Sequence, residues 1–284
     1  MFKNLKKEEL NEQVTLMEIE APLIAKKAKA GQFIIFRIDE NGERVPLTIA
    51  DYDEDAGTVT IIFQKVGKTT NQLSCLNEGD FILDFVGPLG KASHLEGYKK
   101  VAVIGGGLGT AIAYPQAKAL SQMKSEVHSI LGFRNKDLII LKDKVKAVSQ
   151  KTIIMTDDGS NGNQGFVTNA LKEQIENGED YDLVIAIGPL VMMKAVCDVT
   201  KEYGIKTIVS MNPIMIDGTG MCGGCRVTVG GKTMFACVDG PDFDGHQVDF
   251  DSAIRRSKMF KNAERVAQEN HECNLLKKEA EENA

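Results

Sequence analysis

The sequence contains no tryptophan, few aromatic residues and no excess of positive charge. Aromatic residues make up 6% of its 284 residues, and the formal net charge is −6. An acidic chain whose lysines and arginines are spread along its length gives no electrostatic basis for binding nucleic acid. No apolar run approaches the roughly 20 residues that cross a membrane, and the charged start of the chain does not resemble a secretory signal. We expect a cytoplasmic protein that binds neither nucleic acid nor membrane.

Cysteine is scarce too, but its distribution is uneven. Three of the six cysteines fall within a 16-residue stretch, and the other three, Cys75, Cys197 and Cys273, stand alone. Disulfides need an oxidising compartment, of which the sequence gives no sign. A group of cysteines in a cytosolic protein more often binds a metal or carries out redox chemistry. The grouped cysteines are therefore the first candidates for a functional site, and the isolated ones are interpreted as ordinary thiols.

Changes of pattern divide the chain into four parts. Residues 1–97 contain short β-prone runs separated by turn residues, which indicates a small antiparallel β-barrel. In residues 98–211 strand-like and helix-like segments alternate, which predicts an α/β domain with a parallel sheet. Residues 212–250 are rich in glycine and cysteine and too irregular for another strand–helix unit, and residues 251–284 form a charged, helix-prone end. The predicted fold class is a β-barrel, an α/β domain, a small C-terminal domain and a C-terminal helix.

The C-terminal cysteine group has a specific spacing. Four residues separate Asp217 from Cys222, two separate Cys222 from Cys225, and eleven more precede Cys237. Plant-type 2Fe–2S sites have a cysteine, four residues, a cysteine, two residues, a cysteine and a distant fourth cysteine, and this chain has that spacing with an aspartate in first place. A structural zinc site and plain reduced thiols on a turn are the alternatives. The spacing favours the iron–sulfur cluster.

Glycine marks two turns in the α/β part. An apolar strand ends in a glycine-rich turn, where backbone N–H groups and the dipole of the following helix can face a phosphate. The full dinucleotide fingerprint is not met, so an ordinary strand–helix turn is the alternative. A second turn, Gly188-Pro189, ends a later strand and is expected at the same carboxyl edge of the sheet. The candidate residues are Gly105, Gly106, Gly107, Gly109, Thr110, Gly188 and Pro189.

A third candidate site lies in the barrel part, at Arg44-Val-Pro46-Leu47-Thr48. An arginine fork with a nearby hydroxyl can bind a diphosphate through two parallel hydrogen bonds. An arginine on a strand is more often only part of a solvated face, which is the alternative here. Downstream, the segment from Gly67 to Thr70 offers further backbone donors close to the predicted boundary between the first two parts.

The order of these features resembles the ferredoxin–NADP reductase superfamily. Within it, the chain is similar to the electron-transfer subunits that carry a C-terminal 2Fe–2S domain, as in dihydroorotate dehydrogenase B and in electron-bifurcating NADH-dependent ferredoxin:NADP oxidoreductases. The resemblance covers roughly Ala30 to Phe250 and is most specific at Asn212-Pro213-Ile214-Met215 and the cysteine group that follows. The dihydroorotate subunit usually has cysteine where this chain has Asp217, and the bifurcating small subunit has aspartate there. The second resemblance is therefore ranked first.

The resemblance implies three cofactors, namely FAD, a 2Fe–2S cluster and NAD(H). FAD would bind in residues 1–97, NAD(H) in residues 98–211 and the cluster in residues 212–250. The implied FAD contacts are Arg44, Pro46, Leu47, Thr48, Gly67 and Thr70, and the implied cluster ligands are Asp217, Cys222, Cys225 and Cys237. The glycine-rich turn from Gly105 to Thr110 would bind the dinucleotide. Because the cofactors carry the chemistry, no side chain is assigned as a catalytic acid or base.

The implied function is that of a NAD(P)H-dependent flavin and iron–sulfur oxidoreductase subunit. It would pass electrons between NAD(H), FAD and the cluster in an electron-bifurcating complex, as a heterodimer with a larger flavin and iron–sulfur subunit. An electron-transfer subunit of dihydroorotate dehydrogenase B is the alternative within the superfamily. A zinc-stabilised nucleotide-binding regulator is the alternative from another class.

Overall fold

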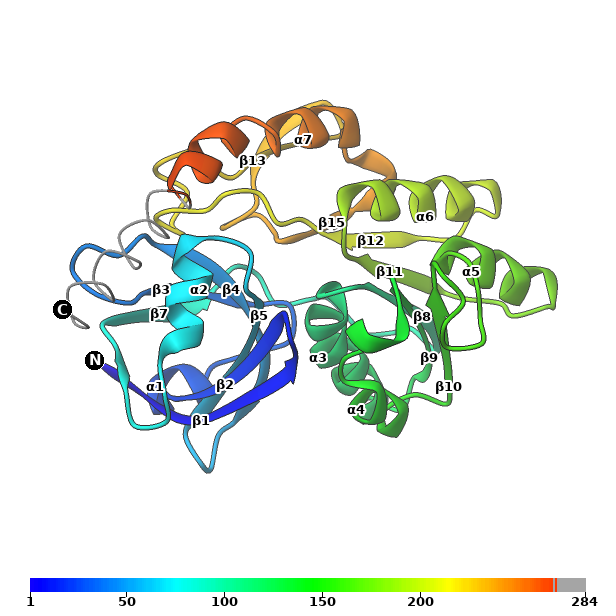
Figure 1. The fold of residues 1–284 in the computed structure, drawn as a ribbon. Coiled ribbons are helices and arrows are strands. Elements are labelled where there is room, and N and C mark those ends of the chain that lie inside the picture. Colours follow the sequence, from blue (N-terminus) through cyan, green and yellow to red (C-terminus); the bar gives the residue numbers. More distant parts are fainter. Residues whose placement is uncertain (268, 270–284) are drawn as a thin grey trace.

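The computed structural model describes residues 1–267 and 269. Its N-terminal part is a seven-stranded antiparallel sheet that curls into a nearly closed barrel, coloured blue to cyan in Figure 1. The strand order is β6-β1-β2-β5-β4-β3-β7. The strands are β1 (Phe2–Asn11), β2 (Val14–Glu20), β3 (Phe33–Arg37), β4 (Val45–Asp53), β5 (Thr58–Gln64), β6 (Phe81–Ile82) and β7 (Asp84–Leu89), with the helices α1 (Pro22–Ala25) and α2 (Lys68–Cys75). The predicted antiparallel barrel is confirmed.

The second sheet has six strands in the order β10-β9-β8-β11-β12-β15. Its first five strands are parallel, and β15 joins the edge antiparallel to β12. The strands are β8 (Lys100–Gly106), β9 (Glu126–Phe133), β10 (Lys151–Thr156), β11 (Leu183–Ile187), β12 (Thr207–Ser210) and β15 (Asp242–Asp244). The connecting helices are α3 (Gly109–Gln122), the 3-10 turn η1 (Lys136–Leu138), α4 (Lys142–Ala147), α5 (Val167–Glu176) and α6 (Leu190–Glu202). The parallel strand order reverses between β8 and β11, and α/β sheets bind ligands at such a point.

The C-terminal part lies across the other two, at the top of Figure 1. It contains the hairpin of β13 (Arg226–Val229) and β14 (Lys232–Phe235), the 3-10 turn η2 (Gly245–Gln247) and the helix α7 (Phe250–Arg256). A turn over residues 257–260 follows α7. The turn interrupts the single C-terminal helix predicted for residues 251–284, and residues 261–267 are helical again. Residues 268 and 270–284, with Cys273, lie outside the described residues. None of the helices in the described part is long and apolar enough to cross a membrane.

One hydrophobic core is shared by all three parts of the chain. It joins Phe33 and Ile35 of the barrel to Ile104 of β8 and to the two buried cysteines, Cys225 and Cys237. Burial of this many apolar side chains fixes the cysteine segment against both neighbours rather than leaving it on a linker. The fold therefore packs the cysteine segment against both the barrel and the α/β sheet.

Candidate functional site

Asp217 organises the first half of the cysteine loop. Its carboxylate accepts hydrogen bonds from the backbone N–H groups of Met221 and Cys222, both at 3.0 Å, and from the hydroxyl of Thr219 at 3.1 Å. The thiol of Cys222 lies 3.3 Å from the other carboxylate oxygen. Burial opposes ionisation, but hydrogen bonds from Cys222 and Thr219 lower the pKa of Asp217 to about 2. The aspartate is therefore an anion at neutral pH, with an oxygen beside one cysteine sulfur.

Cys225 and Cys237 form the second half of the loop, on the buried side. Both side chains are about 1% exposed, and their sulfurs lie 3.2 Å apart. Burial, and next the hydrogen bond with Cys225, raises the pKa of Cys237 to about 12. Without a metal this thiol keeps its proton, so a metal that binds here must displace protons. Cys222 is exposed, so the loop has one buried and one solvent-facing side.

The four side chains thus form two close pairs, Asp217 with Cys222 and Cys225 with Cys237. Two sulfurs bound to one tetrahedral metal lie roughly 3.8 Å apart, for metal–sulfur bonds of about 2.3 Å. A single zinc ion needs all four ligand atoms within such distances. Among the described residues, the one group of three such ligand atoms within 4.8 Å of one another lies elsewhere. The donor set therefore fits a centre of two metals with two protein ligands each.

The two predicted glycine turns meet at the reversal point of the parallel sheet. A side chain on Gly106 would collide with Met192 and Pro189, and one on Gly109 would lie 2.3 Å from the carbonyl oxygen of Ile187. The turn after β8 therefore packs against the backbone of the turn after β11, which only glycine allows. Thr110 follows in the first turn of α3 and is fully buried, and its hydroxyl has no hydrogen-bond partner. A buried, unpaired hydroxyl beside glycine backbone fits a bound polar ligand.

The barrel sheet splits where the predicted flavin residues lie. β4 pairs with β3 through residues 45–48 and with β5 through residues 49–53. Pro46, Leu47 and Thr48 therefore lie on a half-strand with one edge unpaired, where a proline costs no ladder hydrogen bond. Arg44 comes just before this half-strand, and its Nε donates a hydrogen bond to the carbonyl oxygen of Ile216 at 2.7 Å. Arg44 thus connects the predicted flavin strand directly to the cysteine loop.

The segment from Gly67 to Thr70 is the start of helix α2, a helix that the sequence analysis did not predict. The hydroxyl of Thr70 accepts hydrogen bonds from the N–H groups of Val66 and Gly67, both at 3.1 Å. The hydroxyl of Thr69 donates to the carboxylate of Glu43 at 2.6 Å, which brings this end of α2 beside Arg44. The first N–H groups of a helix have no partner within it and favour an anion such as a diphosphate. Thr70 itself is used to shape the turn.

Gly218 joins the cysteine loop to the barrel. A side chain at this position would lie 2.7 Å from Leu89 and 2.9 Å from Ile35, two residues on the barrel strands β7 and β3. Its φ of +78° is also one that favours glycine. The loop after Asp217 therefore contacts the barrel within one residue of a candidate ligand.

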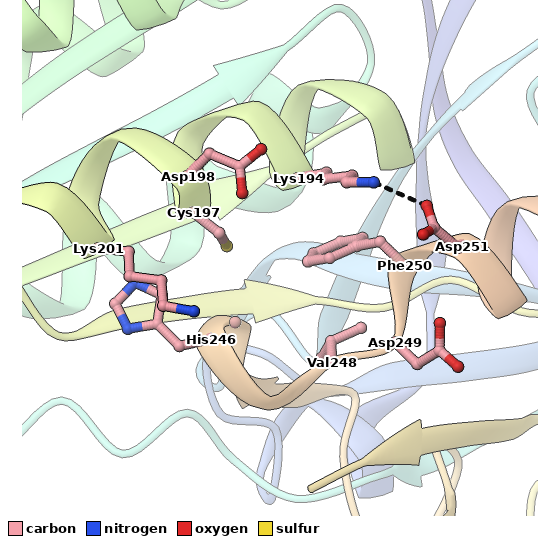
Figure 2. A pocket seen from close by; sticks show the side chains of 10 residues that line it. Lys194, Cys197, Asp198, Lys201, His246, Val248, Asp249, Phe250 and Asp251 are labelled. Carbon is pink, nitrogen blue, oxygen red and sulfur yellow. Dashed lines mark hydrogen bonds and ion pairs between the residues drawn. The ribbon is translucent and has the colours of Figure 1, made fainter. Parts of the chain in front are cut away.

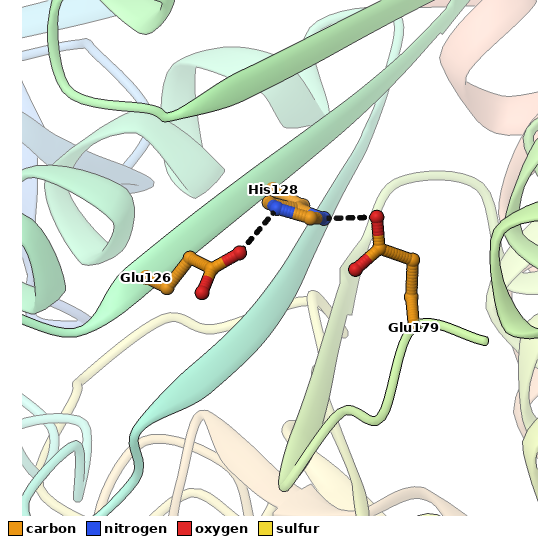
Figure 3. A group of neighbouring side chains, drawn as sticks. All are labelled: Glu126, His128 and Glu179. Carbon is orange, nitrogen blue, oxygen red and sulfur yellow. Dashed lines mark hydrogen bonds and ion pairs between the residues drawn. The ribbon is translucent and has the colours of Figure 1, made fainter.

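Three more ligand-type side chains gather at the opposite, amino edge of the parallel sheet. Glu126, His128 and Glu179 have ligand atoms within 4.8 Å of one another (Figure 3). Lys100 pairs with both glutamates, and Lys151 pairs with Glu179. Burial lowers the pKa of His128, so it is neutral at physiological pH. Because lysines already neutralise the carboxylates, this group is a charge network at the strand ends and not a metal site.

Comparison with known proteins identifies two domains in the chain. Residues 212–249 match the iron–sulfur cluster binding domain of dihydroorotate dehydrogenase B, and residues 103–198 match the oxidoreductase NAD-binding domain. The first range contains the four candidate ligands, and the second contains both glycine turns.

Whole-chain relatives agree with these matches. An uncharacterized protein of Clostridium beijerinckii is 52% identical over 94% of this chain and 93% of its own length. A dihydroorotate dehydrogenase B (NAD(+)) electron transfer subunit homolog of Thermotoga maritima is 44% identical over 93% of both chains. A chain from the structure of an NADH-dependent reduced ferredoxin-NADP oxidoreductase, studied for flavin-based electron bifurcation, is 42% identical with a TM-score of 0.90, over 95% of this chain and 97% of that one.

These matches cover the barrel, the α/β sheet and the cysteine segment together, so they concern the whole arrangement and not one module. The cofactors of such a chain are FAD, a 2Fe–2S cluster and NAD(H). The chain belongs to the family of dihydroorotate dehydrogenase B-type electron-transfer subunits, which are NAD(P)H-dependent flavin and iron–sulfur oxidoreductase subunits of the ferredoxin–NADP reductase fold.

Proposed function

We propose that this chain passes electrons between NAD(H), FAD and a 2Fe–2S cluster as the small subunit of an electron-bifurcating complex of the NADH-dependent ferredoxin–NADP oxidoreductase type. The observation that carries the proposal is the arrangement of the four candidate ligands in two close pairs. Asp217 lies beside Cys222 and Cys225 beside Cys237, on a loop that contacts the barrel. The aspartate in first place supports the bifurcating branch of the family over the dihydroorotate branch.

The proposed division of labour follows the chain. Residues 1–97 would bind FAD, residues 98–211 the dinucleotide and residues 212–250 the cluster. Bound FAD would supply the exchange between two-electron chemistry at the nicotinamide and one-electron chemistry at the cluster. The protein's own residues orient the cofactors: Arg44 and the start of α2 present donors to a diphosphate, and the turns at 105–110 and 188–189 present backbone to the dinucleotide.

A protein partner is the next element of the proposal. The rim of the cysteine loop carries four exposed apolar side chains, Ile214, Ile216, Met221 and Val238, and Met221 is 89% exposed. Apolar side chains grouped around an exposed ligand such as Cys222 favour a docking face more than a solvated one. The occupant we propose is the larger flavin and iron–sulfur subunit of a heterodimer, which would exchange electrons with this chain at this face.

A second candidate function is electron transfer to a dihydroorotate dehydrogenase, and the name of the Thermotoga maritima relative favours it. The two functions differ in the partner. Affinity purification of the tagged chain from its own cells should recover a large flavin and iron–sulfur protein under the first function. Recovery of a dihydroorotate-oxidising flavoprotein instead would support the second.

Anaerobic purification tests the cofactor content directly. The visible spectrum should show flavin and iron–sulfur bands, with about two irons per chain for the proposed cluster type, and NADH should bleach the flavin band. A colourless protein containing zinc would overturn the proposal in favour of a zinc-stabilised regulator.

The aspartate ligand can be tested separately by Asp217→Cys. A thiolate is softer than a carboxylate, so the variant should retain a cluster whose reduction potential differs from that of the wild type. The measurement is a redox titration followed by electron paramagnetic resonance. Identical titrations would show that Asp217 is not a ligand.

A further inference from the structure

An arginine from the C-terminal helix reaches the centre of the cysteine loop. Nη2 of Arg256 on α7 donates a hydrogen bond to the carbonyl oxygen of Gly224 at 3.1 Å, and Gly224 lies between Cys222 and Cys225. The N–H of the same Gly224 donates to the sulfur of Cys222 at 3.4 Å. The guanidinium therefore holds the Gly224 carbonyl toward α7, while the Gly224 N–H faces the candidate ligand Cys222.

The position of Arg256 is fixed by the packing of α7. Phe250, the first residue of the helix, is 5% exposed and belongs to the core shared by all three parts. The carboxylate of Asp249 caps the helix by accepting the N–H of Ser252 at 2.9 Å. Lys194 of α6 pairs with Asp251 at 2.7 Å beside a pocket of about 230 Å³ (Figure 2). These contacts aim the last turn of α7 at the cysteine loop.

A second arginine lies close to the same turn. Nη1 of Arg226 is 3.0 Å from where a side chain on Gly223 would begin. Arg226 is exposed, whereas Arg256 is half-buried. With Arg44 at Ile216, three of the seven arginines in the chain contact the loop from residue 216 to residue 226. An arginine side chain carries a fixed positive charge.

Fixed positive charge has a defined effect on a redox centre. Reduction adds one negative charge to an iron–sulfur cluster, so a nearby cation stabilises the reduced form and raises the reduction potential. The effect is larger where water is partly excluded, and it is screened by salt where the cation is exposed. A carbonyl oxygen held away from the cluster acts in the same direction, because its negative end would oppose reduction.

We propose that Arg256 is a positioning residue that sets the cluster potential: it holds the Gly224 carbonyl away from the cluster and raises the reduction potential, with Arg226 as a weaker, screened contributor. The inference rests on the proposed function, since it requires the cluster. It assigns α7 a role in tuning the redox centre in addition to its packing role.

The test is a redox titration of the purified, cluster-loaded full chain followed by electron paramagnetic resonance. Arg256→Gln should lower the midpoint potential, and Arg226→Gln should lower it by less. The matched control is Arg255→Gln, which removes the same charge one residue earlier from an exposed position near Asp251 and should leave the potential unchanged. Arg256→Lys keeps the charge without the planar donor fork, so its potential should lie between those of the wild type and Arg256→Gln.

The outcomes separate this inference from the proposed function. Absence of iron from the wild-type protein would overturn the proposed function itself. A wild-type cluster with equal potentials in Arg256→Gln and Arg255→Gln would overturn only the role of Arg256. Equal potentials in Arg256→Lys and Arg256→Gln would overturn the role of its charge. If Arg256→Gln does not retain a cluster, the midpoint potentials of Arg226→Gln and Arg256→Lys are compared with that of Arg255→Gln. Potentials below that of the control support the inference, and equal potentials in all three variants reject it.

Discussion

At the scale of single residues, the hydroxyl of Thr110 offers the clearest test of the dinucleotide site. It is buried and unpaired, so Thr110→Val should not lower the free energy of unfolding and should weaken NAD(H) binding about 5- to 10-fold, the value of one hydrogen bond. Thr200→Val is the control, because the Thr200 hydroxyl bonds Cys197, His246 and Thr207. The control should lose stability and keep its affinity. Binding titrations and thermal unfolding of both variants distinguish the two patterns, and equal affinity of Thr110→Val and wild type would count against the site.

Asp242 at the start of β15 gives a pH-dependent prediction. Its carboxylate accepts hydrogen bonds from Ser93 at 2.5 Å and from Gln116 at 3.2 Å, and its second oxygen is buried without a partner. Burial raises the pKa of Asp242 from 3.8 to about 6, against those hydrogen bonds. The folded protein therefore holds this proton more tightly than the unfolded chain. The resulting stability is complete below pH 4 and is lost as the pH rises to about 6, with a magnitude of about 3 kcal/mol.

The apparent midpoint of thermal unfolding, measured between pH 5 and about pH 7.5, checks this sign. In the wild type the unfolding midpoint should fall as the pH rises, and Asp242→Asn should remove part of that fall. Asp55→Asn changes an exposed carboxylate and should leave that decline in place. Equal pH dependence in wild type and Asp242→Asn would show that Asp242 does not ionise in this range.

The residue scale also shows which contacts the sequence can and cannot predict. The four candidate ligands follow from spacing, because they lie on one short loop and their separation is set by the chain itself. The contact of Arg44 with Ile216 joins residues 172 positions apart, and that of Arg256 with Gly224 joins residues 32 apart. Neither has a sequence pattern, because both depend on how separate parts of the chain pack.

At the scale of elements, periodicity predicts the buried ones well. The strands β2, β9, β11 and β12 and the helix α5 each have a regular apolar face or run, which is the pattern that indicates such elements in a sequence. The strand β1 was not predicted, because its sequence is mostly polar and only Asn4 in it is fully buried. Helix α2 was not predicted either, because only Thr69 and Leu73 of its eight residues are buried and no apolar stripe forms. Tertiary contacts decided both elements.

Helix α7 provides the prediction at this scale. Phe250 anchors it in the shared core, so Phe250→Ala should destabilise the protein by about 3–5 kcal/mol and release the helix. Hydrogen exchange should become faster over residues 250–256 in particular, because the capping contacts of Asp249 alone do not hold the helix. Phe166→Ala is the control, since that ring is 64% exposed and its loss should change little. Unchanged exchange in α7 would mean that the ion pair with α6 is the main anchor.

At the scale of the whole molecule, the segment after β12 contacts both the second sheet and the barrel. The sequence predicts the order of barrel, α/β sheet and cysteine segment, and the structure adds that β15 extends the second sheet after the cysteine loop. Lys118 of α3 pairs with Asp51 of β4 at 2.7 Å, across the boundary between the first two parts. The cysteine loop lies above the barrel in Figure 1, where Gly218 contacts the strands β3 and β7. One face of that loop is left outward, and it carries the apolar rim.

The partner prediction belongs to this outward face. Met221 is 89% exposed, so replacing it should leave the fold intact, and Met221→Asp puts a charge at the centre of the proposed docking surface. Desolvating that charge should weaken assembly with the larger subunit by at least about 10-fold, while NADH still reduces the chain's own flavin. Met123→Asp places the same charge on an exposed methionine at the end of α3 and should assemble normally. Co-purification and iron content of both variants provide the measurement. Normal assembly of Met221→Asp with a full complement of iron would show that the larger subunit docks elsewhere, and the apolar rim would then need a different occupant.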